Sequence, residues 1–375
     1  MSVTNLPNLS SLAYLKISNC TLHFIFEGVG HKARMEKVML PGAIIAGASE
    51  ALEYVETSRH IFLDLSYSSL QSFSFLHSMN VLTDLNLSES ALTDESIEHI
   101  AYIGTNKRYL NLSNTKVSSD GIGTLPEHVP NLETLLLSGT PVDDMAVPYI
   151  SMMPSLKVIN LSRTNVKGLI HQEGDSPHDA PSFSALKNLS HLEKLELEEI
   201  NIKDAALFPL MNLDKLIYLS LQSVSLTDAS LYRVSSASKL IHLGVRDAVL
   251  TDGGLDSFIP PPAMEVLDIR GSWLLTKDVL LRFCHKHPRV EVRHELVEAL
   301  DKRNFHYSSP SRLTMRTSQH KHKQSKLSMS PHRPDDIFLD QRLKYTREES
   351  LALQFSSAAF STSTHHQGNR DSNVT

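Results

Sequence analysis

Cysteine is scarce in this chain, because only Cys20 and Cys284 occur among 375 residues. Two cysteines so far apart exclude a disulfide framework and are typical of a reducing compartment. Apolar runs are also short: none approaches the ~18 residues that a membrane span needs. The first residues lack the basic and apolar segments of a signal peptide. We therefore expect a soluble cytoplasmic protein, with the nucleus as a second compartment, and no membrane contact.

Motifs for catalysis and metal binding are missing as well. The sequence has no nucleophile elbow, no phosphate-binding loop and no zinc motif. Histidines do gather near Cys284 and again between residues 302 and 334, but without the spacing of metal ligands. We therefore expect no enzyme activity, no metal and no cofactor.

What the sequence does contain is a repeat. In residues 82–92, leucines stand at offsets 0, 3, 5 and 10 from the start of a unit, as Leu82, Leu85, Leu87 and Leu92. Units of this kind start at residues 12, 35, 60, 82, 107, 132, 156, 192, 216, 240, 264 and 287. The spacing is 22 to 25 residues, except for one step of 36 that we interpret as a repeat plus an insertion of 12. Copies in phase over such a length predict stacked structural units.

The spacing within a unit predicts its structure. Offsets 3 and 5 differ by two, so both side chains leave one face of a strand toward the core, and the residues around them face the other way. A second apolar set at offsets 15 and 18, such as Ile97 and Ile100, has helical spacing. The Thr-Asp pairs at 93–94, 227–228 and 251–252 should begin the helices, since threonine caps free N–H groups and aspartate suits the positive helix end.

The unit reads roughly Leu-x-x-Leu-x-Leu-Ser-x-Thr, as in residues 110–115 and 135–140. It resembles the ribonuclease-inhibitor-like leucine-rich repeats, especially the cysteine-containing repeats of intracellular F-box/leucine-rich-repeat proteins, over residues 1–303. The resemblance implies an α/β leucine-rich-repeat solenoid of about 12 repeats of ~24 residues, with a parallel concave sheet and short convex helices. The polar residue that the family has at offset 8 is present as Cys20, Thr115, Thr140 and Thr164, and is replaced by Ile200, Val224 and Ala248.

The resemblance also implies a function in protein recognition. Those relatives recruit substrates to an SCF-type ubiquitin ligase through an F-box ahead of the repeats, and the printed sequence has no F-box there. Two hypotheses therefore stand side by side: substrate recognition for such a ligase, or a ligase-independent regulatory or inhibitory binding protein.

Three segments lie outside the regular pattern. The polar, acidic insertion at 168–182 is interpreted as a surface loop at one rim, with a loop over the binding face as the alternative. Residues 302–334 hold eight Lys or Arg and no Asp or Glu, which favours a disordered, regulatable tail over 304–375 and makes nucleic acid the less favoured partner. Leu6 and Leu9 precede the first unit as Ile150 and Met153 precede a later one. We therefore expect the chain to start inside a repeat, either as a shortened product or with its edge covered by a partner.

The candidate binding residues lie on the predicted concave face. At offset 6 the sequence reads Ser66, Ser88, Ser113, Ser138, Ser162, Glu198, Gln222, Arg246, Arg270 and Arg293. The serines suit tight turns. The arginines predict a site for an acidic or phosphorylated segment, unless Asp247, Asp268 and Glu291 neutralise them. Aromatic side chains at concave offsets are expected to anchor a protein partner: Tyr14, Phe62, Tyr67, Tyr109 and Tyr218.

Overall fold

The computed structural model describes residues 14–19, 21–23, 33–34, 36–42, 44–46, 55–56, 61–70, 72–172 and 178–297. The chain divides into two units, Met1–Arg293 and His294–Thr375, and the architecture below belongs to the first. The expectations for Leu6, Leu9 and Cys20, for the domain boundary at residue 303 and for the tail at 304–375 lie outside the described residues.

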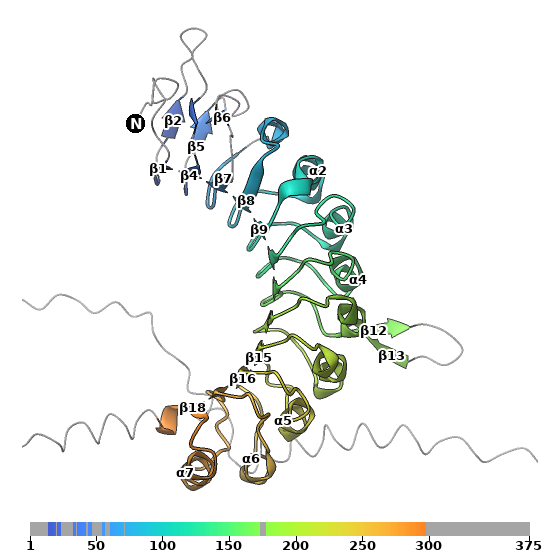
Figure 1. The fold of residues 1–375 in the computed structure, drawn as a ribbon, viewed down its shortest axis with the longest axis vertical. Coiled ribbons are helices and arrows are strands. Elements are labelled where there is room, and N and C mark those ends of the chain that lie inside the picture. Colours follow the sequence, from blue (N-terminus) through green and yellow to red (C-terminus); the bar gives the residue numbers. More distant parts are fainter. Residues whose placement is uncertain are drawn as a thin grey trace, which may run out of the picture. The chain divides into compact units, whose positions relative to one another are not determined.

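One parallel sheet runs through the first unit. Its 12 described strands lie in the order of the chain, one per repeat, so the predicted stack of units is confirmed. Helices lie along one side of this sheet (Figure 1). The strands are β1 (Tyr14–Lys16), β4 (Lys37–Met39), β7 (Ile61–Asp64), β8 (Leu82–Asn86), β9 (Tyr109–Asn111), β10 (Thr134–Leu136), β11 (Val158–Asn160), β14 (Lys194–Leu197), β15 (Tyr218–Gln222), β16 (His242–Arg246), β17 (Val266–Asp268) and β18 (Glu291–Arg293).

The core lies between the sheet and the helices. Strand leucines at offsets 3 and 5, such as Leu110 and Leu112, are fully buried, and so are the helical pair Ile97 and Ile100. Each unit therefore buries one face of its strand and one face of its helix against its neighbours. This is why a single unit could not be stable alone.

The helical segments are short. The α-helices are α2 (Asp94–Tyr102), α3 (Ser119–Gly123), α4 (Ala146–Ile150), α5 (Asp228–Val234), α6 (Asp252–Ser257) and α7 (Lys277–Lys286), and the 3₁₀ segments are η2 (Ser74–Ser78), η3 (Gly104–Asn106), η4 (Ser182–Asn188) and η5 (Asp204–Asn212). The Thr-Asp pairs begin α2, α5 and α6 as predicted, and the hydroxyls of Thr227 and Thr251 accept the expected bond from a backbone N–H, whereas Thr93 makes no such cap. Pro209 inside η5 has no N–H and would clash in an α-helix, which suits the 3₁₀ form.

The helix starts are also joined from unit to unit. Asp228 accepts hydrogen bonds from the backbone N–H and the hydroxyl of Thr251, at 2.7 and 2.6 Å. Asp252 makes the same pair of bonds to Thr276, at 2.8 Å each. The aspartates thus tie each helix start to the next, a role beyond the helix-end effect that the sequence predicted.

A left-handed residue ends nearly every strand, and the sequence pattern did not reveal it. One position after offset 6, the backbone φ is positive except at Ser223 and His294, wherever this position is described. An ideal Cβ on Gly139 would lie 2.0 Å from Oδ1 of Asn114, so a side chain could be added there only if Asn114 moved. The residues with positive φ at this position are Asn19, Gly42, Tyr67, Glu89, Asn114, Gly139, Arg163, Glu199, Asp247 and Gly271.

The insertion forms an antiparallel hairpin of β12 (Leu169–Gln172) and β13 (His178–Pro181). These strands extend from the helix side of the sheet, so in the described residues the insertion does not reach over the strand face (Figure 1). Buried Asp144 holds the base of the hairpin, accepting bonds from the N–H groups of Lys167 and Gly168 and from the hydroxyl of Ser182, at 2.6 to 2.8 Å.

Two small parallel pairs complete the described strands. They lie in the first units of the repeat, before β7. They are β2 (Thr21–His23) with β5 (Ile44–Ala46), and β3 (Ala33–Arg34) with β6 (Val55–Glu56).

Candidate functional site

The strand face opposite the helices includes a row of side chains in direct register. Four of the five predicted aromatic anchors lie in it, and we call it the aromatic row. Because adjacent strands lie ~4.8 Å apart, side chains in such a row touch their neighbours. From β1 to β18 the row reads Tyr14, Lys37, Phe62, Asp84, Tyr109, Thr134, Val158, Lys194, Tyr218, His242, Val266 and Glu291.

The first part of the aromatic row combines rings with a lysine. The ammonium of Lys37 lies 5.8 Å from the ring centre of Tyr14 and 4.9 Å from that of Phe62. The rings of Phe62 and Tyr109 are 6.5 Å apart across the intervening strand. Burial raises the pKa of Tyr109, so its hydroxyl stays protonated and can donate a hydrogen bond. The structure therefore brings Tyr14, Phe62 and Tyr109 into one surface.

The second part is a stack. Tyr218 and His242 lie parallel, with ring centres 4.3 Å apart, and the ammonium of Lys194 lies 4.6 Å from the ring centre of Tyr218. Burial, and then the charge of Arg293, lowers the pKa of His242, so the ring is uncharged at neutral pH. His242 and both lysines were not predicted from the sequence, although they occupy the same strand position as the aromatic residues in their units.

The predicted arginines all have acidic partners. Arg246 forms an ion pair with Glu198 two strands away and contacts Oε1 of Gln222 at 3.3 Å. Arg270 binds Asp268 through two bonds, at 2.9 and 2.5 Å, and Arg293 binds Glu291 at 2.7 Å. Asp268 and Glu291 thus neutralise two of the arginines as the alternative foresaw. Asp247 instead accepts a bond from Gln222 at 2.7 Å.

Asp268 shows how strong this pairing is. Burial alone would raise its pKa, but the hydrogen bonds and charge of Arg270 outweigh burial and hold the pKa below its usual value. The carboxylate therefore remains ionised although it is only 4% exposed.

Arg293 does not lie where the sequence predicted. It was expected in the row of Arg246 and Arg270, but it pairs in register with Asp268, while Val292 pairs with Leu267. The last strand starts two residues later than the apolar pattern suggested, because Val292 rather than Val290 takes the first core position. Arg246 and Arg270 are therefore not continued by a third arginine.

The serines of offset 6 close turns, as predicted. Four of the five are buried, namely Ser66, Ser88, Ser138 and Ser162. The backbone N–H groups of Ser66, Ser88, Ser113 and Ser162 donate to Asp64, Asn86, Asn111 and Asn160, at 2.9 to 3.1 Å. Tyr67 follows Ser66 in the turn itself, with φ 58° and 65% exposure, so it lies beyond the aromatic row.

The described part of the chain contains no group of three or more His, Cys, Asp or Glu side chains placed to hold a metal ion. Within the same residues, no helix is long and apolar enough to cross a bilayer. The strand face gathers aromatic rings together with cationic and acidic side chains, which suit noncovalent contact with another chain.

No protein-family model and no curated protein matches this sequence. Solved structures do match. An internalin (inlF) of Listeria monocytogenes has a TM-score of 0.52 at 16% identity, over 77% of this chain and 88% of that one. A leucine-rich-repeat protein of Leptospira interrogans also has a TM-score of 0.52, at 18% identity, over 76% of this chain and 67% of that one. At such identities the likeness shows the fold alone. The fold is a leucine-rich-repeat solenoid, while the ribonuclease-inhibitor-like subtype stays a prediction.

Proposed function

We propose that this leucine-rich-repeat chain is a non-enzymatic scaffold that binds a protein partner on the exposed face of its sheet. The observation that carries the proposal is the aromatic row, in which Phe62 and Tyr109 from different strands form one surface with Lys37. Rigid rings held by a sheet lose little entropy on binding, and aromatic residues are frequent hot spots at protein interfaces.

The test is a pair of variants with a matched control. Phe62→Ala with Tyr109→Ala removes the centre of the row, and Tyr102→Ala removes an aromatic side chain of 69% exposure from α2 on the helix side. Partners are identified by affinity purification and mass spectrometry from the full chain, and each purified partner is then titrated by calorimetry. We expect at least a tenfold loss of affinity in the first variant and none in the control. Equal affinities for both would contradict the proposal.

The ligase hypothesis is one finer form of this proposal, and a ligase-independent regulator or inhibitor is the other. The support for a ligase is the likeness of the repeat unit to F-box/leucine-rich-repeat proteins. Co-purification with the adaptor subunit that binds F-boxes distinguishes the two. Its presence in stoichiometric amount favours the ligase, and its absence from every complex favours the regulator.

An acidic or phosphorylated partner segment is a further finer form. It would have to exchange with the carboxylates that already hold Arg246 and Arg270, so we place these arginines second to the aromatic row. Arg246→Glu with Arg270→Glu tests the idea if binding and thermal stability are measured separately. Lost binding with unchanged stability would favour the anion site, and lost stability with unchanged binding per folded molecule would leave the arginines a structural role.

A further inference from the structure

Two adjacent helical segments leave aromatic rings uncovered on the helix side. Phe208 in η5 is 62% exposed and Tyr232 in α5 is 83% exposed. Both line one groove of about 580 Å³, together with Met211, Arg233, Ser235 and Ser236. Clustered apolar side chains that remain in water usually mark a contact site, and this volume lies within the range of ligand-binding clefts.

The repeat itself provides a control for this observation. The two rings stand 16 residues after the unit starts at 192 and 216. The helix side therefore does not require an aromatic residue at this position, and the pair is particular to two neighbouring units. The matching residues of α2, α3, α4, α6 and α7 are Glu98, Gly123, Pro148, Asp256 and Leu280, none of them aromatic.

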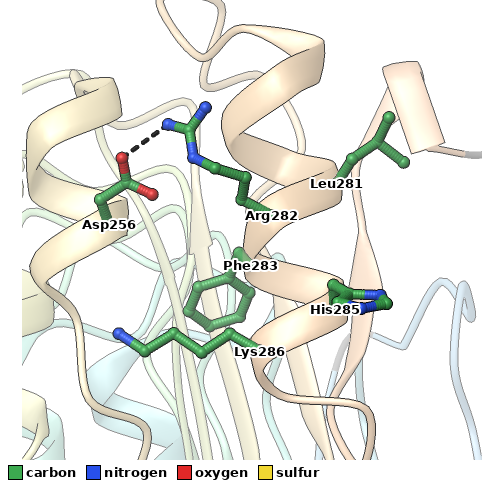
Figure 2. Close-up of a pocket in the computed structure, with 6 residues that line it drawn as sticks. All are labelled: Asp256, Leu281, Arg282, Phe283, His285 and Lys286. Atoms are coloured by element: carbon green, nitrogen blue, oxygen red, sulfur yellow. Dashed lines mark hydrogen bonds and ion pairs between the residues drawn. The ribbon is translucent and has the colours of Figure 1, made fainter.

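Between α6 and α7, an ion pair of the protein's own side chains occupies the matching place. Asp256 of α6 accepts a bond of 2.6 Å from Arg282 of α7, beside a cavity of about 710 Å³ (Figure 2). Leu281 and His285 point to the other side of α7, away from Asp256 (Figure 2). Between α6 and α7, therefore, the cation of one helix already has the anion of its neighbour, whereas η5 and α5 present two rings and a cation.

That cation is Arg233, the charged residue among those that line the groove. Its Nε is buried without a hydrogen-bond partner, and among the described residues its guanidinium makes no ion pair. The positive charge of Arg233 acts to lower the pKa of Asp204, so the two groups are near each other. The Asp204 carboxylate nevertheless accepts its hydrogen bonds from the N–H and hydroxyl of Thr227, at 3.1 and 2.7 Å. A guanidinium in this state gains most from a carboxylate, which it can bind through charge-assisted hydrogen bonds.

We propose that the groove between η5 and α5 binds a short segment of a partner protein. The segment places an apolar side chain between Phe208 and Tyr232 and an aspartate or glutamate carboxylate on Arg233. This site lies on the helix side of the solenoid, so it is independent of the strand face and of the function proposed for it.

The experiment uses the full chain and a phage-displayed library of random dodecapeptides. The library is selected in parallel on the natural chain, on Phe208→Ser with Tyr232→Ser, and on the control Met152→Ser, which removes another exposed apolar side chain of the helix side. Selected peptides are synthesised with Asp or Glu and with Asn or Gln at the acidic position, and they are titrated against all three proteins and Arg233→Gln. Methyl NMR of ¹³C-methionine compares Met211 in the groove with Met145 and Met152 outside it.

We expect peptides that join an apolar residue to a neighbouring acid, with at least tenfold weaker binding to the double serine variant and unchanged binding to Met152→Ser. The Asn or Gln analogues should bind the natural chain as weakly as the acidic peptides bind Arg233→Gln. On peptide binding, the methyl signal of Met211 should shift, and those of Met145 and Met152 should not. Selection of no peptide that loses affinity in the double variant would overturn the proposal. The proposal would also be overturned if the peptides that bind the groove contained no acidic residue, or if peptide binding did not shift the Met211 methyl signal. Thermal melts confirm that every variant is folded.

Discussion

The two halves of the sheet have the same backbone path but close their turns differently. In the serine half, β7 to β11, a hydroxyl at offset 8 donates to the carbonyl of the last core leucine: Ser90, Thr115, Thr140 and Thr164 do so at 2.6 to 2.7 Å. In two units of the charged half, β14 to β18, Ile200 and Ala248 occupy the matching place and are buried, and neither has a hydroxyl to donate; Val224 at the same offset is 60% exposed. One fold thus tolerates two solutions, a hydrogen bond or apolar packing.

The exposed face changes at the same boundary. In the serine half, Asn86, Asn111 and Asn160 accept bonds from the backbone N–H groups of largely buried serines, while the charged half has the pairs Glu198–Arg246 and Asp268–Arg270. Ion pairs on a surface contribute less to stability than buried contacts, unless one member is itself buried. The comparison therefore predicts that electrostatic substitutions matter chiefly in the charged half. The serine half contains one clear exception.

The exception is Lys107, and it should give the largest effect. It stands at a unit start where Leu82, Leu132 and Leu156 stand in other units, and it is completely buried. Its ammonium donates to the carbonyls of Leu82 and Ile103, at 2.5 and 3.1 Å. Burial nevertheless lowers its pKa from 10.5 to about 7.

Below pH 7 Lys107 is charged in both the folded and the unfolded chain, and the folded chain bears the full cost of a buried charge. Between pH 7 and 10.5 only the unfolded chain keeps the proton, so the free energy of unfolding should rise with pH. Removing the buried charge by Lys107→Leu should raise the free energy of unfolding by up to about 5 kcal/mol at pH 6, and losing the bonds to the two carbonyls should offset about 1–3 kcal/mol of this gain. Near pH 10.5 only that loss remains, so the variant should be the less stable chain there. Urea titrations from pH 6 to 10.5 measure both curves, with exposed Lys116→Leu as control. If the free energy of unfolding of the natural chain does not rise between pH 7 and 10.5, the two carbonyls compensate fully for the burial of the ammonium group.

Arg270→Leu should give the next largest effect. Asp268 would lose the partner that holds its pKa low, while its burial remains. We expect a loss of about 1–3 kcal/mol at pH 7, as is typical when a hydrogen-bonded buried group loses its partner. In the natural chain the lowered pKa of Asp268 stabilises the fold at pH values above the pKa that Asp268 has in the unfolded chain. This stabilisation is lost as the pH falls through the pKa of the folded chain. In the variant, a raised pKa makes stability improve as pH falls toward 4.

The two pH curves should therefore converge in acid, which chemical denaturation at pH 4 and 7 can measure. The matched control is Arg282→Leu, since Arg282 also pairs with an aspartate but both partners are exposed. We expect little change in the control. Parallel curves for Arg270→Leu and the natural chain would exclude Asp268 as the source of the effect.

A charge exchange at Glu198 and Arg246 should give a smaller effect. These side chains are only 27% and 24% exposed, and they lie two strands apart with Gln222 between them. Each single variant, Glu198→Arg or Arg246→Glu, should destabilise the fold, and the double exchange should recover about 1 kcal/mol of coupling. The more exposed pair Glu133 and Lys157 of the serine half, treated the same way, should recover less. Equal coupling in the two pairs would remove the electrostatic difference between the halves.

The sequence predicted the units, the strand positions and the core well, because a two-residue spacing repeated in every unit leaves no other register for the leucines. It failed at the last strand, where Val290 and Val292 both fit the apolar pattern and only strand pairing distinguishes them. It found the aromatic residues of the strand face individually. It did not find the stack of His242 on Tyr218 or the bond from Arg246 to Glu198, because those contacts join units 24 or more residues apart. The left-handed turn residues were missed as well, since Asn, Gly, Tyr, Glu, Arg and Asp all occupy that position.

The smallest expected effect tests whether the two ways of closing the turn are equivalent. Thr140 is buried, and its hydroxyl donates to the carbonyl of Leu137 at 2.7 Å, so Thr140→Val keeps the shape and removes one hydrogen bond. The Leu137 carbonyl still accepts a bond from the backbone N–H of Thr140 at 3.2 Å. The free energy of unfolding should therefore fall by only about 0.5–1 kcal/mol. Ala248→Ser makes the reverse change, since Ser90 has this residue type after the same left-handed turn. We expect a gain of up to about 0.5 kcal/mol, measured with Thr140→Val in urea titrations at pH 7. A loss in Ala248→Ser as large as that in Thr140→Val would mean that the charged half has packed its turns too closely to accept a hydroxyl, and that the two solutions cannot be exchanged between the halves.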